Sequence, residues 1–74
     1  MKSGKKITVL KEARKNIKKT QIQIAEELGV SRMTVTYWEN GQMNPVAKDL
    51  WRIAKSYQLS DIEIVNWIKQ ISED

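Results

Sequence analysis

Apolar residues recur along the chain at spacings of three and four, the repeat of an α-helix with one buried face. The first such stripe runs from Ile7 to Ile17 and includes Leu10 and Ala13. Four more stripes follow, in residues 21–28, 32–39, 46–57 and 60–72. The sequence offers no segment with the alternating pattern of a strand. The pattern therefore predicts an all-α fold of five helices.

Capping residues set the boundaries of the second and third helices. Thr20 followed by Gln23 has the spacing of a capping box. Gly29 can adopt the positive φ at which a helix stops, and Ser31 can cap the next helix two residues later. Two short helices joined by so tight a turn predict a helix-turn-helix over residues 20–41.

A helix-turn-helix implies a particular use of its two helices. The first crosses the DNA backbone, and the second lies in the major groove with its first residues at the base edges. In the segment 32–39, Val35 and Trp38 fall on the inward face. The outward face carries Arg32, Met33, Thr36 and Tyr37, which can donate hydrogen bonds or contact a thymine methyl group.

Composition narrows the function classes. The chain has 74 residues, enough for one domain that buries only roughly 60% of its unfolded surface. It has no cysteine and no histidine, so disulfides, thiolate chemistry and imidazole catalysis are excluded. We expect no enzyme, no metal site and no cofactor. No apolar run approaches the roughly 20 residues of a membrane span, so we expect a cytoplasmic protein without membrane contact.

Charge is unevenly distributed within the net charge of +4. Residues 1–19 contain eight lysines and arginines and one acid, whereas residues 56–74 contain one lysine and four acids. This asymmetry indicates a polyanionic partner on one side, although a solvated lysine-rich helix gives the same pattern. We expect residues 1–6 to be a basic flexible arm and residues 7–74 to form a single domain.

Several ordered motifs carry a family resemblance. Thr20 begins the run TQIQIAEELGVS, followed by VTYWENG, by a loop proline at Pro45 and by a helix that contains LWRIA. Over roughly residues 10–65 the chain resembles the lambda-repressor-like helix-turn-helix family of phage repressors and Cro proteins. The resemblance implies a sequence-specific transcriptional regulator that binds a pseudo-palindromic operator in double-stranded DNA as a homodimer.

The resemblance also implies roles for individual residues. Base-reading positions of the family fall on Ser31, Arg32, Met33 and Tyr37, with Thr36 as a further candidate. Phosphate-binding positions fall on Gln21, Asn40, Gln42 and Asn44. Lys19 and Thr20, at the start of the second helix, are further phosphate candidates because helix starts offer free N–H groups.

One arginine lies on the wrong side of its helix. Arg14 falls among the apolar positions of the first helix, where a charge needs a partner. In the family it pairs with the glutamate of Glu-Asn-Gly, which is Glu39 here.

The chain also departs from the family pattern at its reading helices. Ile22 is apolar where a polar residue or alanine is common. Met33 and Tyr37 favour contact with thymine methyl groups over bidentate hydrogen bonds.

The last helix, residues 60–72, is capped by Ser60 with Glu63 and has more apolar residues than one narrow stripe needs. Its main stripe consists of Ile64, Trp67, Ile68 and Ile71, and Ile62 and Val65 form an adjacent strip. Three interpretations stay open: a wide core-facing stripe, a homodimer seam, or a surface for a different protein. The third suits an alternative function, a protein-binding module of antirepressor or antitoxin type that docks a second regulator as a heteromeric partner.

Overall fold

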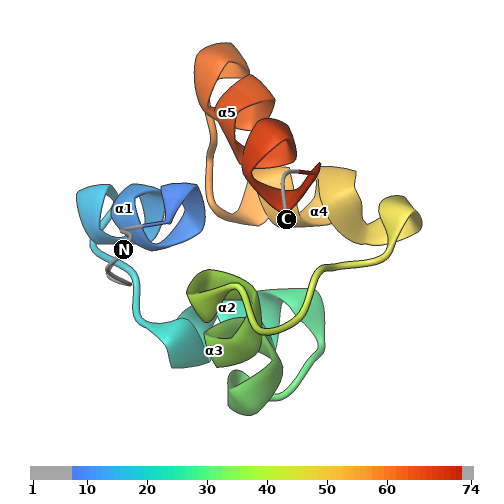
Figure 1. Cartoon of the computed structure of the whole chain (residues 1–74). Coiled ribbons are helices and arrows are strands. Elements are labelled where there is room, and N and C mark those ends of the chain that lie inside the picture. The colour runs from blue at the N-terminus through green and yellow to red at the C-terminus, as the bar shows by residue number, and fades with distance from the viewer. Residues whose placement is uncertain (1–7, 73–74) are drawn as a thin grey trace, which may run out of the picture.

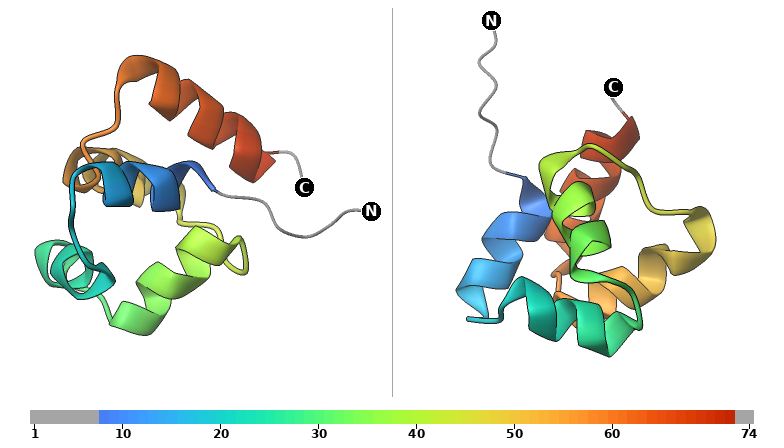
Figure 2. Two further views of the ribbon diagram at one scale, coloured as in Figure 1. Left: turned by 90° about the vertical axis from the view of Figure 1, so that its left-hand side faces the viewer. Right: turned by 90° about the horizontal axis from the view of Figure 1, so that it is seen from below.

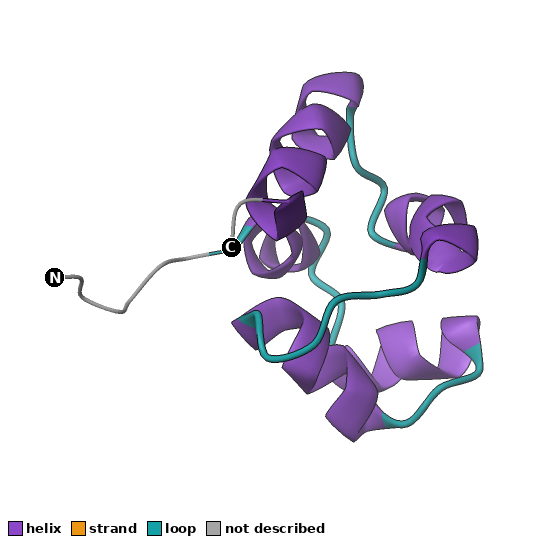
Figure 3. Cartoon of the chain, turned by 45° about the vertical axis from the view of Figure 1, so that its right-hand side comes forward, coloured by secondary structure: helices purple, strands orange, loops and turns teal. Residues whose placement is uncertain are grey.

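The structure of the chain is a computed structural model that describes residues 8–72 (Figure 1). These residues form five α-helices and one 3-10 turn and contain no strand (Figure 3). The elements are α1 (Val9–Asn16), α2 (Gln21–Leu28), α3 (Arg32–Asn40), η1 (Ala47–Asp49), α4 (Leu50–Ser56) and α5 (Asp61–Ser72). The all-α prediction is confirmed. No helix in this part of the chain is long and apolar enough to cross a membrane.

The helices are arranged with the helix-turn-helix at one end of the molecule. α2 and α3 pack against each other, α4 packs on α2, and α1 lies between α3 and α5. Figures 1 and 2 show α5 at the end opposite α2 and α3. The surface of α3 that faces away from the core is therefore left uncovered by the other helices.

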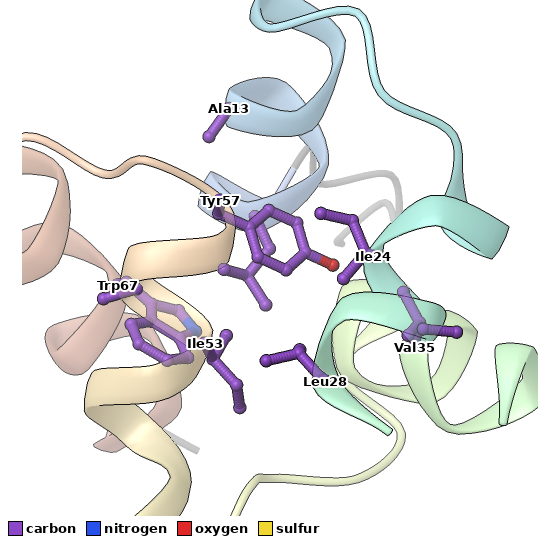
Figure 4. Close-up of a cluster of buried hydrophobic side chains, with 10 residues drawn as sticks. Ala13, Ile24, Leu28, Val35, Ile53, Tyr57 and Trp67 are labelled. Atoms are coloured by element: carbon purple, nitrogen blue, oxygen red, sulfur yellow. The ribbon is translucent and has the colours of Figure 1, made fainter. Parts of the chain in front are cut away.

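The core lies at the centre of this arrangement and receives residues from every α-helix. Figure 4 shows the Tyr57 ring between Trp67 and Ile24. The buried apolar residues are Leu10, Ala13, Ile24, Ala25, Leu28, Val35, Ile53, Ala54, Tyr57 and Trp67. A core of ten residues explains how so short a chain holds five helices in one arrangement.

The caps of the helix-turn-helix form as the sequence indicates. The Thr20 side chain accepts a hydrogen bond from the backbone N–H of Gln23 at 3.0 Å, and the Gln23 side chain accepts one from the N–H of Thr20 at 2.8 Å. Gly29 ends α2 with a φ of 70°, and Ser31 caps α3 through the N–H of Thr34. These contacts fix the angle at which α3 leaves α2.

Two helices differ from the prediction at their first residues. The Thr8 side chain caps α1, which therefore begins at Val9, and Ile7 lies outside the described residues, as does the predicted arm 1–6. The predicted helix 46–57 is wrong in its first turn. Val46 is extended, and the chain passes through the 3-10 turn η1 before α4 begins at Leu50.

The apolar residues of α5 divide between the core and the surface. Trp67 is 2% exposed, and Ile64 and Ile71 pack against the same core because α1 lies alongside α5. Trp67 is thus a core residue of its own chain and not part of an exposed seam. The exposed strip of α5 is instead Ile62, Val65 and Ile68, which are 64%, 51% and 40% exposed.

Candidate nucleic-acid interface

Arg14 and Glu39 meet below the surface and join α1 to α3. Arg14 Nε donates to Glu39 Oε2 at 2.7 Å, and Arg14 Nη2 donates to Glu39 Oε1 at 3.0 Å. Arg14 Nη1 donates to the carbonyl oxygen of Lys19 at 3.0 Å. The guanidinium therefore fixes the linker before α2 as well as the end of α3, which is the geometry of a brace.

Glu39 is 1% exposed and accepts two further hydrogen bonds. Tyr57 Oη donates at 2.6 Å and Gln21 Nε2 at 3.1 Å. Burial disfavours the charged carboxylate, but the donated hydrogen bonds outweigh burial and hold the pKa of Glu39 below its ordinary value. Glu39 therefore stays ionised at neutral pH and ties α1, α2, α3 and the residue after α4 to one point.

The outward face of α3 is open to solvent. Ser31, Arg32 and Met33 are exposed at its start, and Tyr37 follows one turn later. Met33 is 57% exposed and Tyr37 36%. The Arg32 guanidinium has no hydrogen-bond partner among residues 8–72. Arg32, Met33 and Tyr37 can therefore contact another molecule without breaking an internal hydrogen bond, whereas Ser31 Oγ already accepts one from the N–H of Thr34.

Thr36 differs from the other base-reading candidates. It is half-buried, and its hydroxyl lies 3.0 Å from Gln21 Oε1 and 3.1 Å from the carbonyl oxygen of Arg32. Both contacts have Thr36 as the donor, so its single hydroxyl proton is used inside the protein.

The phosphate candidates form two groups around α3. The first lines a surface pocket between the starts of α2 and α3, whose walls are Arg14, Lys19, Thr20, Gln21, Ile22 and Arg32. The second lies at the end of α3 and in the loop after it, where Asn40, Gln42 and Asn44 are all exposed. Asn40 Nδ2 donates to Gln42 Oε1 at 3.3 Å. The two groups lie at the opposite ends of α3.

Lys19 already has a partner in the folded chain. Its Nζ lies 2.7 Å from Glu27 Oε2, and Ser56 Oγ donates to Glu27 Oε1 at 2.7 Å. The hydrogen bonds from Lys19 and Ser56 hold the pKa of Glu27 below its ordinary value. A phosphate would compete with Glu27 for Lys19, so this lysine is a weaker phosphate candidate than Gln21.

Two residues that position the site carry no local sequence signal. Tyr57 follows α4, and its hydroxyl reaches Glu39 across 18 residues of sequence. Arg52 of α4 donates to the last carbonyl of α2, that of Leu28, at 2.6 Å. Spacing within a single helix cannot indicate contacts of this kind, because they depend on how α4 packs on α2.

Comparison with known proteins places the fold in a family. A family model described as helix-turn-helix matches residues 10–64 of the chain. The chain belongs to the helix-turn-helix family. The resemblance of its motifs to lambda-repressor-like regulators is thereby confirmed, and the matched residues include all of α2 and α3.

Three relatives of this helix-turn-helix chain are named as transcriptional regulators or repressors. It is 38% identical over 61 residues, 82% of its length, to the HTH-type transcriptional regulator DicA of Escherichia coli. It is 36% identical over 55 residues, 74% of its length, to the cryptic phage CTXphi transcriptional repressor RstR of Vibrio cholerae. An uncharacterized HTH-type transcriptional regulator of Archaeoglobus fulgidus is 36% identical over 59 residues, which are 77% of this chain and 83% of that protein.

The chain matches less than half of the length of each of the first two relatives. The chain spans 42% of the length of DicA and 49% of that of RstR. No solved structure matches it closely enough to compare. The family match runs from the second residue of α1 to the first turn of α5.

Proposed function

We propose that this chain is a sequence-specific DNA-binding transcriptional regulator of the repressor type. α3 lies in the major groove of a double-stranded operator, and bound protein blocks access to a promoter. The observation that carries this function is the open outward face of α3, where Ser31, Arg32, Met33 and Tyr37 are exposed. The repressor relative RstR and the regulator DicA support the same conclusion.

Base reading is assigned to the start of α3. Arg32 is the donor suited to guanine, and a bidentate contact of this kind contributes about 1–3 kcal/mol of discrimination. Met33 and Tyr37 offer apolar contact to thymine methyl groups. The operator is therefore expected to contain guanine and thymine within each half-site.

Backbone contacts are assigned to both ends of α3. Gln21 and the N-terminus of α2 bind one phosphate, and Asn40 with Gln42 and Asn44 bind another. These groups are neutral, so the charged contact with phosphate is assigned to Lys19, which lines the same pocket as Gln21. Affinity should fall linearly on a plot of log K against log salt, with a slope that counts the charged contacts.

Selection of bound sites from random duplex DNA tests the function. The wild type should recover one consensus, and Arg32→Ala and Tyr37→Ala should each lose preference at part of it. Lys55→Ala, an exposed cation on α4 outside the helix-turn-helix, serves as the control and should recover the wild-type consensus. A consensus that neither α3 substitution changes would contradict the assignment of α3 as the reading helix.

Homodimer formation would place two copies of α3 on a pseudo-palindromic operator, about one helical turn or roughly 34 Å apart. The exposed strip of α5, Ile62, Val65 and Ile68, is the proposed contact. Three side chains cover far less than the ~800 Å² per partner of a standard interface. The dimer is therefore expected to be weak in solution and to be stabilised by binding of both copies to one DNA molecule.

The order of residues along α5 suits a second copy of the same helix. In an antiparallel pair centred on Val65, Ile62 lies level with Ile68 of the second copy. Asp61 then lies level with Lys69 of the second copy, and both are exposed. A two-fold interface requires this self-complementarity of shape and charge.

A cysteine at position 65 tests this pairing directly, because the chain has no cysteine of its own. Val65→Cys should form a disulfide-linked dimer under mild oxidation, faster in the presence of operator DNA. Lys55→Cys on α4 is the matched control and should crosslink slowly. Equal crosslinking of the two variants would exclude the Val65-centred pair.

The apolar character of the reading face favours a second candidate, a protein-binding module of antirepressor or antitoxin type. Ile22 is 54% and Met33 57% exposed, and both lie on the helix-turn-helix. Such a module would bind DNA weakly and without sequence preference but would bind a second regulator tightly. The selection experiment separates the two candidates, because a module of this kind yields no consensus.

A further inference from the structure

The side-chain amide of Gln21 is held in one orientation by two residues of α3. Glu39 is ionised and can only accept hydrogen bonds, so the group of Gln21 that lies 3.1 Å from it is Nε2. Oε1 of the same amide accepts the Thr36 hydroxyl at 3.0 Å. Rotation of the amide by 180° would break both contacts and place an oxygen against the carboxylate.

This orientation leaves one N–H of Gln21 Nε2 available. Gln21 lines the surface pocket between the starts of α2 and α3 together with Arg32. A phosphate in that pocket would meet an N–H donor rather than a carbonyl oxygen. The hydroxyl of Thr36, in contrast, has its only proton directed to Gln21 and to the carbonyl oxygen of Arg32.

We propose that Thr36 is a positioning residue for DNA binding, which acts through Gln21 and reads no base. This role rests on the proposed DNA-binding function. Thr36 and the buried carboxylate of Glu39 together preset the Gln21 amide before DNA arrives. Preorganisation of a donor removes the cost of ordering it on binding, so the contribution of Thr36 is to affinity and not to sequence preference.

Thr36→Val tests this role because it removes the hydroxyl and keeps the shape of the side chain. We expect affinity to fall about 2–10-fold, the range of one hydrogen bond, and by the same factor for the selected site and for single-base variants of it. Gln21→Ala should lower affinity at least as much, and Thr36→Val should add nothing in the Gln21→Ala background. Thr36→Ser, which restores the donor, should restore most of the affinity.

The orientation of the Gln21 side-chain amide can also be measured by NMR in the absence of DNA. In ¹⁵N-resolved spectra of the free protein, the two Gln21 side-chain protons should resonate away from those of a solvated glutamine, and the proton donated to Glu39 should be protected from exchange. Thr36→Val should bring them toward those of a solvated glutamine, with the fold checked by circular dichroism. Unchanged Gln21 signals would overturn the inference whether or not DNA binds.

The outcomes separate this inference from the function on which it rests. A change of preference at one base pair in Thr36→Val, or losses that add in the double variant, would overturn the positioning role and leave DNA binding intact. No sequence-preferring binding by the wild type would overturn the proposed function, and the role of Thr36 in it.

Discussion

Glu39 loses nearly all contact with water on folding, which is costly for a carboxylate unless every oxygen is hydrogen-bonded. Arg14, Gln21 and Tyr57 donate to it, and each comes from a different part of the chain. No buried polar side-chain atom among residues 8–72 lacks a partner. The donated hydrogen bonds therefore offset part of the cost of burying the charge, and they join α1, α2 and α3 at one carboxylate.

Tyr57→Phe should reduce the free energy of unfolding by about 1.5–3 kcal/mol at neutral pH, the range for a hydrogen bond to a charged group. The Tyr57 hydroxyl is one of the groups that lower the pKa of Glu39. A lowered pKa contributes stability above the unfolded value, about 4.3, and this stability is lost as the pH falls through the folded value. Urea unfolding should therefore show the variant and the wild type converging below about pH 4.3. A difference that stays constant down to acid pH would show that the Tyr57 hydroxyl does not act through the charge of Glu39.

At the scale of residues, the sequence indicated the pair of Arg14 and Glu39 through the position of an arginine among apolar residues and through the family resemblance. It did not indicate that Tyr57 and Gln21 share the same carboxylate. Those contacts cross 18 residues each, and tyrosine on an apolar stripe is adequately explained as a core residue. Thr36 was assigned to the outward face, and only its side-chain geometry places the hydroxyl inside.

Helices α1 and α4 end differently from α2 and α3. α2 and α3 stop at glycines with positive φ, Gly29 and Gly41. α1 and α4 are followed by Lys18 and Gln58 with φ of 58° and 56°, a conformation that costs a residue with a Cβ about 1–2 kcal/mol. The segments after α1 and α4 therefore store a small strain.

Gln58→Gly should relieve this strain and raise the free energy of unfolding. The gain is about 0.5–1 kcal/mol, because the entropy lost by glycine on folding offsets part of the relief. Gly29→Ala is the reverse change at a φ of 70° and should destabilise. Thermal unfolding of both variants checks the pair; a Gln58→Gly protein less stable than the wild type would contradict the strain.

At the scale of elements, capping residues were reliable guides because a cap is a local contact. Thr20 with Gln23 and Ser60 with Glu63 form the boxes that their spacing predicts. The start of α4 was not predicted correctly. The segment 46–49 has no side-chain cap hydrogen bond, Val46 is extended, and Ala47–Asp49 form the 3-10 turn η1 before α4 begins.

For the whole molecule, the placement of α5 decides which apolar residues are core. A stripe of apolar residues on a helix cannot show which half faces its own chain, and α1 settles this by packing beside α5. Trp67 is consequently in the core, whereas Trp51 on α4 is 66% exposed. The two tryptophans thus differ in burial although both lie on helices with apolar stripes.

Trp67→Ala should cost about 3–5 kcal/mol because it leaves a cavity in the core. A domain of 74 residues has a total stability of only about 4–11 kcal/mol, so most of its margin should be lost. Trp51→Ala is the matched control and should change stability by less than about 0.5 kcal/mol. Chemical unfolding followed by circular dichroism measures both; equal effects would contradict the placement of Trp67 in the core.

The central claim is that the start of α3 reads base edges. The most direct test is the affinity of the wild type and of Arg32→Ala for the selected operator and for every single-base variant of one half-site. We predict that Arg32→Ala loses about 1–3 kcal/mol of discrimination at one guanine position and keeps it at the others. A uniform loss of affinity at all positions would make Arg32 a backbone contact and contradict the account.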